Sequence, residues 1–155
     1  MRKTTERIYG RGERSYSLID HSITHHQFLY RQFGEDAKNH DILFAGVAYF
    51  SLPIYLNDFI IRPATADELE DLKPKFKRSR WMRRAFIIEE GTFRHFIVAN
   101  DVAEQWNDYE ALETSIDMNR EENQMSMEEL HRMMEELQAG TYVPPTSKYE
   151  WIFLK

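Results

Sequence analysis

The sequence predicts a single α+β domain, in which a mostly antiparallel sheet of about five to six strands carries two acidic amphipathic helices in the C-terminal third. The chain has 155 residues and an apolar fraction of 42%, which suits one domain with a substantial core. Short runs of aromatic and β-branched residues between Gly and Pro breaks recur before residue 100 and favour strands. In residues 101–139 the apolar residues instead recur every three or four positions, which favours helices.

The N-terminal residues 1–14 contain few apolar groups and are expected to form a flexible basic arm. The folded domain is therefore predicted to cover residues 15–155. Within it, residues 24–33 leave two alternatives open. Thr24 with Gln27 three positions later has the spacing of a helix capping box, but the same segment also suits a strand.

Strand and helix signals alternate through the middle of the chain. One near-continuous apolar run suits a central strand covered on both faces, and two strand-like runs joined through Gly91 suit an antiparallel hairpin. Thr65 and Glu68 repeat the capping-box spacing and predict a short helix. The expected elements are strands over 42–50, 56–62, 85–89 and 93–98 and a helix over 66–72.

Two acidic helices are expected next, over 101–116 and 126–139. Each begins with Asp or Ser placed three positions before an acidic residue, Glu104 or Glu129, which is a capping pattern. An alternating run over 149–154 then predicts a strand that rejoins the sheet. The apolar stripes of the two helices are Trp106, Tyr109, Leu112 and Ile116 in the first and Met127, Leu130, Met134 and Leu137 in the second.

Composition excludes several classes of protein. The chain has no Cys, so disulfides, thiolate zinc sites and cysteine nucleophiles are absent, and a reducing compartment such as the cytoplasm is expected. Its six glycines do not form a phosphate-binding loop, and no cofactor is expected. The longest uncharged stretch, residues 42–57, contains Gly46 and Pro53 and is too short to span a bilayer, so no membrane partner is expected.

The distribution of charge suggests the function. Residues 101–139 carry twelve Asp and Glu against two Lys and Arg, which is steep for solubility alone. An acidic helical surface attracts basic partners. We therefore expect a small intracellular binding or inhibitor protein without catalytic residues, of the kind of a bacterial immunity protein (antitoxin) that neutralises a basic partner such as a nuclease toxin. The residues expected to bind it are Trp106, Asp108, Tyr109, Glu110, Glu113, Asp117, Met118, Glu121 and Glu122.

Two alternative functions rest on other clusters. His21, His25 and His26 beside Asp20 have the residue types and spacing of a divalent metal site, which would suit a metal-dependent enzyme or sensor. Residues 73–84 combine cations with aromatic rings, the ingredients of single-strand nucleic-acid binding. The same basic stretch would also serve as an internal clamp against the acidic helices. The cations and ring of this stretch that would contact nucleic acid are Lys75, Lys77, Arg78, Arg80, Trp81, Arg83 and Arg84.

Overall fold

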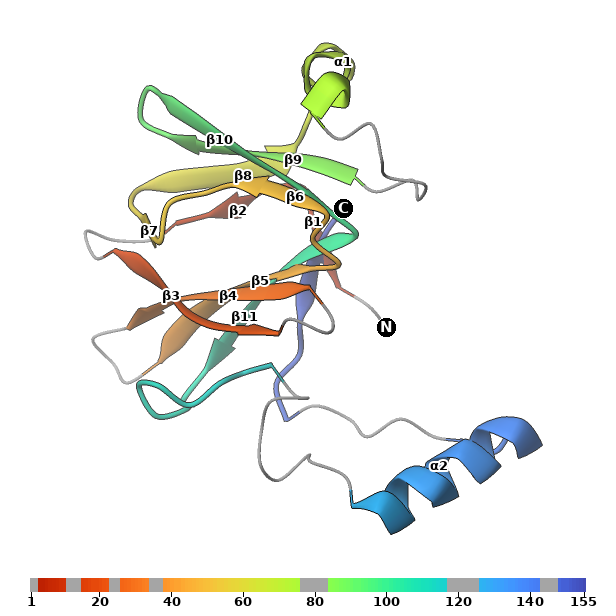
Figure 1. The fold of residues 1–155 in the computed structure, drawn as a ribbon. Coiled ribbons are helices and arrows are strands. Elements are labelled where there is room, and N and C mark those ends of the chain that lie inside the picture. Colours follow the sequence, from red (N-terminus) through yellow and green to blue (C-terminus); the bar gives the residue numbers. More distant parts are fainter. Residues whose placement is uncertain are drawn as a thin grey trace.

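The computed structural model of the chain is mostly β, so the predicted α+β class with two acidic helices is wrong. The structure describes residues 3–10, 15–22, 26–33, 38–75, 84–116, 126–142 and 148–155. Within these ranges, twelve strands form a seven-stranded and a five-stranded sheet, and the helices are short. The two sheets face each other as the layers of a β-sandwich (Figure 1).

The seven-stranded sheet contains strands from both ends of the chain. Its pairs are antiparallel, except that β1 runs parallel to β12. The pairing of β11 with β5 and of β5 with β4 forms the centre of this sheet. Its strands, in spatial order, are β1 (Thr4–Thr5), β12 (Ile152–Leu154), β11 (Asp101–Asn107), β5 (Asn39–Ala45), β4 (Gln27–Phe33), β3 (Tyr16–Ser22) and β7 (Tyr55–Leu56).

The five-stranded sheet contains the predicted hairpin. Its two strands, β9 and β10, turn at Gly91 with Glu90 opposite Phe93, which confirms that prediction. The predicted capping box of Thr65 and Glu68 is also confirmed, and it starts α1 (Ala66–Leu72), which continues into the 3₁₀ turn η1 (Lys73–Lys75). The strands, in spatial order, are β2 (Ile8–Tyr9), β8 (Phe59–Pro63), β9 (Arg84–Glu90), β10 (Phe93–Ala99) and β6 (Tyr49–Ser51).

The main core lies between the two sheets, because alternate side chains of each strand point inward. Burying one such large apolar side chain contributes about 1.5–3 kcal/mol. A smaller cluster under α1, with Leu72 and Ile87, covers part of the outer face of the five-stranded sheet. The main core contains Ile8, Tyr16, Tyr30, Ile42, Phe44, Val47, Leu56, Phe59, Ile61, Phe86, Ile88, Ile97, Ala99, Val102 and Leu154.

Two crossings between the sheets lie side by side. The predicted strand over 42–50 is interrupted at Gly46, whose φ of +65° ends β5 and lets the chain move to β6 in the other sheet. The chain crosses back from β10 to β11 at Asn100, whose backbone N–H donates to the Ala45 carbonyl oxygen at 2.9 Å. A Cβ on Gly46 would lie 2.4 Å from the Asn100 amide nitrogen, so the crossing leaves no room for a side chain.

The predicted helix over 101–116 is wrong, because residues 101–107 form β11 and the rest is irregular. Both faces of β11 are covered: Val102 enters the main core, while Ala103 and Gln105 are buried on the outer face of the sheet. The charged Glu104 on the core side masks the alternation that marks a strand. The segment over 24–33, open between helix and strand, forms β4.

The second predicted acidic helix is confirmed as α2 (Met127–Ala139). Ser126 accepts from Glu129 N–H while the Glu129 side chain accepts from Ser126 N–H, and Gly140 closes the helix with φ of +74°. This helix stands apart from the sandwich (Figure 1) and has no buried residue. Among the described residues, no helix has the length and apolar character needed to cross a membrane.

Candidate functional site

The nine residues predicted to bind a partner are distributed over β11 and the segment that follows it. Trp106 is on β11, and Asp108, Tyr109, Glu110 and Glu113 lie on the irregular segment 108–116. This segment runs along the outer face of the seven-stranded sheet (Figure 1). Four of the predicted residues fall outside the described ranges, namely Asp117, Met118, Glu121 and Glu122.

Trp106 belongs partly to the interior of the sandwich. Its ring is half-buried and stacks on His40, with centroids 4.6 Å apart and planes inclined by 16°. His40 Nδ1 lies 2.5 Å from the Tyr16 hydroxyl, and its Nε2 lies 2.8 Å from Glu104 Oε2. Glu104, a member of the acidic block, is thus used inside the fold and is not available to a partner.

A buried ion pair on the outer face of the seven-stranded sheet holds the 108–116 segment. Arg31 donates from Nε to Asp41 Oδ1 at 2.6 Å and from Nη2 to Oδ2 at 2.7 Å, and both side chains have no exposed surface. Its Nη1 lies 3.1, 3.2 and 2.7 Å from the carbonyl oxygens of Glu110, Ala111 and Glu113. One guanidinium therefore fixes the backbone of the segment against two strands.

Amide side chains extend this network. Asn107 Nδ2 donates to the Asp41 carboxylate at 2.8 Å and to Gln105 Oε1 at 2.9 Å. Asn39 Nδ2 donates to Asn107 Oδ1 at 3.0 Å and to the Tyr109 carbonyl at 2.9 Å. Because these polar groups are buried and mutually bonded, the segment has a preorganised backbone. The sequence offers no local signal for this network, since most of its hydrogen bonds join residues 66 to 82 positions apart.

The acidic side chains of this segment differ in their surroundings. Asp108 is exposed and accepts a hydrogen bond from the Tyr149 hydroxyl, with the Lys148 ammonium 3.8 Å away. The Tyr149 hydrogen bond, helped by Lys148, lowers the pKa of Asp108. Glu110 is exposed, and the Glu113 carboxylate accepts from the Glu110 N–H at 3.1 Å. The segment thus presents negative charge on a fixed backbone.

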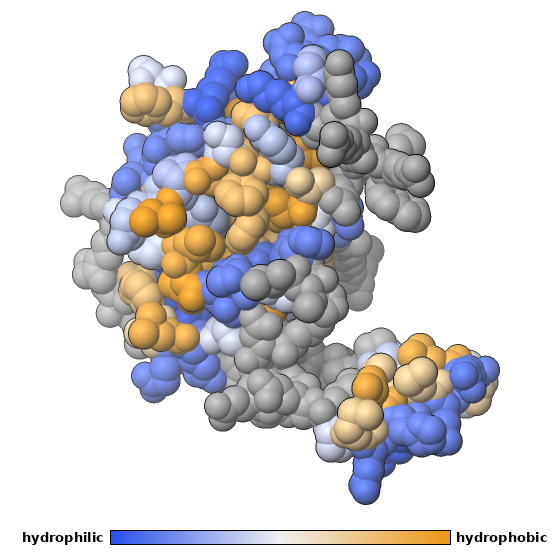
Figure 2. Space-filling model, in the orientation of Figure 1, coloured by the Kyte–Doolittle hydropathy of each residue, from blue (hydrophilic) through white to orange (hydrophobic). Residues whose placement is uncertain are grey.

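The apolar stripe predicted on the second helix is exposed to solvent. Met127, Leu130, Met134 and Leu137 show 80%, 37%, 52% and 54% of their surface. In Figure 2 apolar atoms gather along one side of α2 and polar atoms along the other. The sequence predicts this stripe, but as the face of a helix packed on the sheet.

Carboxylates occupy the face of α2 opposite the stripe. At 100° per residue, the four glutamates lie about 120–140° from the centre of the stripe, in two pairs separated by Arg132, the only Lys or Arg on α2. Glu135 lies 3.3 Å from the exposed His131 on the same helix. Among the described residues, no ion pair joins the 101–139 block to residues 73–84. The glutamates are Glu128, Glu129, Glu135 and Glu136.

Two of the clustered histidines meet at a small cavity. His21 on β3 and His26 in the β3–β4 turn line a space of about 290 Å³, whose walls include the rings of Phe28 and Phe50. Asp20 turns away and accepts from the Thr114 hydroxyl. Within the described part of the chain, no group of three His, Asp or Glu is placed to hold a metal ion. His25 lies outside that part.

The basic stretch is described only at its two ends. Lys73 pairs with Glu70 on α1, the Lys75 ammonium lies 4.9 Å from the Phe96 ring centroid, and Arg84 begins β9. Residues 76–83, which include the proposed stacking residue Trp81, lie outside the described residues. A continuous nucleic-acid surface here stays a prediction.

Comparison with protein families, curated proteins and solved structures gives no match for this chain. Its function is therefore inferred from its own surface.

Proposed function

We propose that this chain is a small binding protein, of inhibitor or immunity type, that engages a basic protein partner through α2. The observation that supports this most strongly is the exposed apolar stripe of α2 on a helix whose opposite face is acidic. The stripe has the spacing of a helix that lies in a groove, because its four residues follow one another at intervals of three, four and three. A helix of this length extends about 20 Å, which suits a single short groove.

The exposed stripe indicates that the acidic composition of α2 serves binding and does more than keep the protein soluble. Glutamates alone would keep the protein soluble. An exposed line of Met and Leu works against solubility, and such patches mark sites of interaction. Methionine side chains are flexible and adapt to an irregular apolar surface. The combination on one helix is therefore that of a docking element.

Charge favours a basic groove over a second copy of the chain. The helix carries four glutamates and one arginine, so pairing with an identical helix would bring like charges together. Two helices of this length would also bury little surface compared with the roughly 1,200–2,000 Å² of stable interfaces. A groove with an apolar floor would cover the stripe, and Lys and Arg on its high rims would attract the acidic opposite face.

The 108–116 segment is proposed as a second contact. Asp108 and Glu110 are exposed on a segment whose backbone is held by Asn39 at the Tyr109 carbonyl and by Arg31 at the Glu110 carbonyl, so little ordering would be needed on binding. Because Asp108 stays ionised with its lowered pKa, this contact retains its charge at neutral pH.

A defined peptide tests the chemistry of α2. The probe is a fluorescein-labelled helical peptide of Leu and Lys, and its anisotropy is followed while the full chain is titrated at low and at physiological salt. We expect saturable binding that weakens with salt. Two double variants, Leu130→Asp/Met134→Asp and Glu128→Lys/Glu135→Lys, should each weaken peptide binding by about tenfold or more, equivalent to about 1.4 kcal/mol.

The matched control is Asp67→Lys with Asp71→Lys on α1, which changes the same charge at exposed positions away from α2. Binding retained by this control supports the proposal. Equal losses in the two charge-reversal variants, with no loss from Leu130→Asp and Met134→Asp, would show attraction to net charge only and would contradict it. A dimer that forms with concentration in size-exclusion chromatography, and that disappears with the Leu130 and Met134 changes, would identify a second copy as the occupant instead.

A further inference from the structure

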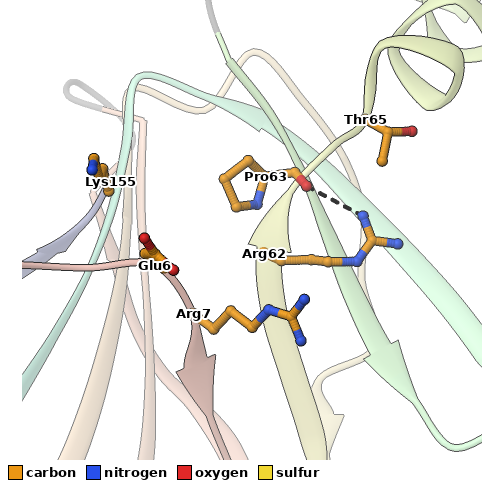
Figure 3. Close-up of a pocket in the computed structure, with 6 residues that line it drawn as sticks. All are labelled: Glu6, Arg7, Arg62, Pro63, Thr65 and Lys155. Atoms are coloured by element: carbon orange, nitrogen blue, oxygen red, sulfur yellow. Dashed lines mark hydrogen bonds between the residues drawn. The ribbon is translucent and has the colours of Figure 1, made fainter.

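A second candidate site lies on the opposite layer of the sandwich. A cavity of about 480 Å³ opens where β2, the end of β8, the start of α1 and the residue after β12 meet (Figure 3). It lies within the range of volumes of small-ligand sites. Three of its six lining residues are cations and one is an anion. The lining consists of Glu6, Arg7, Arg62, Pro63, Thr65 and Lys155.

Two arginines lie directly across a strand pair at this cavity. Ile8 is opposite Ile61 in the β2–β8 pair, and continuing this antiparallel register by one residue places Arg7 opposite Arg62. Since both isoleucines are fully buried and side chains alternate, the arginines point to the outer face. In Figure 3 the Arg7 side chain extends toward that of Arg62. Like charges in this arrangement disfavour pairing unless they are compensated.

Arg62 is compensated from within the fold. Its guanidinium donates to Glu68 at 2.7 and 3.1 Å, to Glu89 at 2.8 and 3.0 Å, and to the Pro63 carbonyl at 3.2 Å. These bonds use all five of its N–H groups. The hydrogen bonds to Glu68 raise the pKa of Arg62 and lower the pKa of Glu68 to about 2, so both remain charged. Arg62 is a fixed positive wall of the cavity.

Arg7 and Lys155 have their donors available. Neither the Arg7 guanidinium nor the Lys155 ammonium forms an ion pair or side-chain hydrogen bond with the residues that the structure describes. The carboxylates of Glu68 and Glu89 are offset by Arg62 and by Arg94, whose Nη1 is 4.0 Å from Glu68. Arg7 and Lys155 therefore face Glu6 alone, which leaves about one positive charge for a ligand.

We infer that this cavity binds the oxyanion group of a small molecule, a carboxylate or a phosphate, with Arg7 as its hydrogen-bond donor and Lys155 adding positive charge from the other side of Glu6. The planar fork of a guanidinium matches either group with two parallel hydrogen bonds. A residual charge of about one suits a single oxyanion group, whereas a polynucleotide requires a longer row of cations. The site is separate from α2, so it stands or falls independently of the proposed protein partner.

Side-chain and backbone NMR signals test the site in the full chain. Inorganic phosphate and acetate are titrated separately at constant ionic strength while the Arg7 Nε–H and Thr65 N–H resonances are followed. We expect saturable shifts with at least one of the two anions. Replacing Arg7→Gln should weaken binding about tenfold or more, because a charge-assisted hydrogen bond is lost. Arg132→Gln is the matched control, since it removes the same charge from an exposed residue on α2 that does not line the cavity.

Each outcome separates the ligand classes. Saturation by phosphate alone supports a phosphate ester, and saturation by acetate supports a carboxylate. No saturation by either anion would overturn the inference, as would equal weakening by Arg7→Gln and Arg132→Gln. A labelled single-stranded oligonucleotide that binds with a steep salt dependence and is weakened equally by both variants would overturn it in favour of an extended nucleic-acid surface.

Discussion

Replacing Asp41→Asn should destabilise the protein more than almost any other conservative change. The Asp41 carboxylate accepts from Arg31 Nε and Nη2, from Asn107 Nδ2 at 2.8 Å and from the Ser115 hydroxyl, and it is fully buried. An asparagine keeps the volume but removes the negative charge. The Arg31 guanidinium then remains buried without a counter-charge.

The size of the effect follows from that uncompensated cation. Breaking a buried ion pair by removing one partner costs about 3–5 kcal/mol. Whole domains have a free energy of unfolding of only about 5–15 kcal/mol, so the variant would lose a large share of its stability. For a chain of this size each kcal/mol lowers the Tm by roughly 2–4 °C, so we expect a decrease of about 6–20 °C.

Urea unfolding followed by tryptophan fluorescence measures the loss, with Asp67→Asn on the exposed surface of α1 as the control. Adding Arg31→Met to Asp41→Asn should restore part of the stability, because it removes the stranded charge. A loss below about 1 kcal/mol for the single variant would refute the reasoning. So would a double variant that is less stable than the single one.

Three further predictions concern local features. Hydrogen bonds from Arg62 lower the pKa of Glu68 to about 2. The contribution of Glu68 to stability is therefore present above about pH 5 and is lost as the pH falls from there toward 2. Glu68→Gln should flatten this part of the stability profile, measured by urea unfolding. Ser126→Ala removes a cap worth about 1 kcal/mol from a helix that is not packed, so circular dichroism should show less helix while the Tm of the sandwich stays unchanged. Gly46→Ala and Gly91→Ala both force a side chain to positive φ, but only the first meets a neighbouring asparagine, so Gly46→Ala should cost about 1–3 kcal/mol more in denaturant unfolding, and equal costs would argue against the close crossing.

The capping boxes and the hairpin could be predicted because their contacts are local. Thr65 with Glu68 and Ser126 with Glu129 satisfy each other's backbone donors within one turn, whereas Asp101 and Glu104 have the same spacing and lie in β11, because strand pairing overrides the local pattern there. Gly91 supplies the positive φ of a short turn between two strands that pair directly. The stripe on α2 follows from periodicity for the same reason.

The candidate site was only partly predictable. The acidic and apolar residues of α2 are visible in the sequence, but their exposure is not. The cavity at Arg7 and Arg62 has no sequence signal, because it depends on how β2 registers with β8. The helix over 101–116 is predicted wrongly because its apolar residues recur every three or four positions. In the structure residues 101–107 form β11, whose two faces are both covered, so its buried residues do not alternate with exposed ones.

The turn at Gly91, the caps of α1 and α2 and the concentration of negative charge depend on residues a few positions apart, so they can be predicted from the chain alone. The arrangement of the strands in two facing sheets, the burial of Glu104 and Asp41 with distant partners and the exposure of α2 depend on the folded structure. Strand pairing and burial join residues far apart in the chain, so their free energy depends on the whole fold and has no local pattern from which it can be inferred.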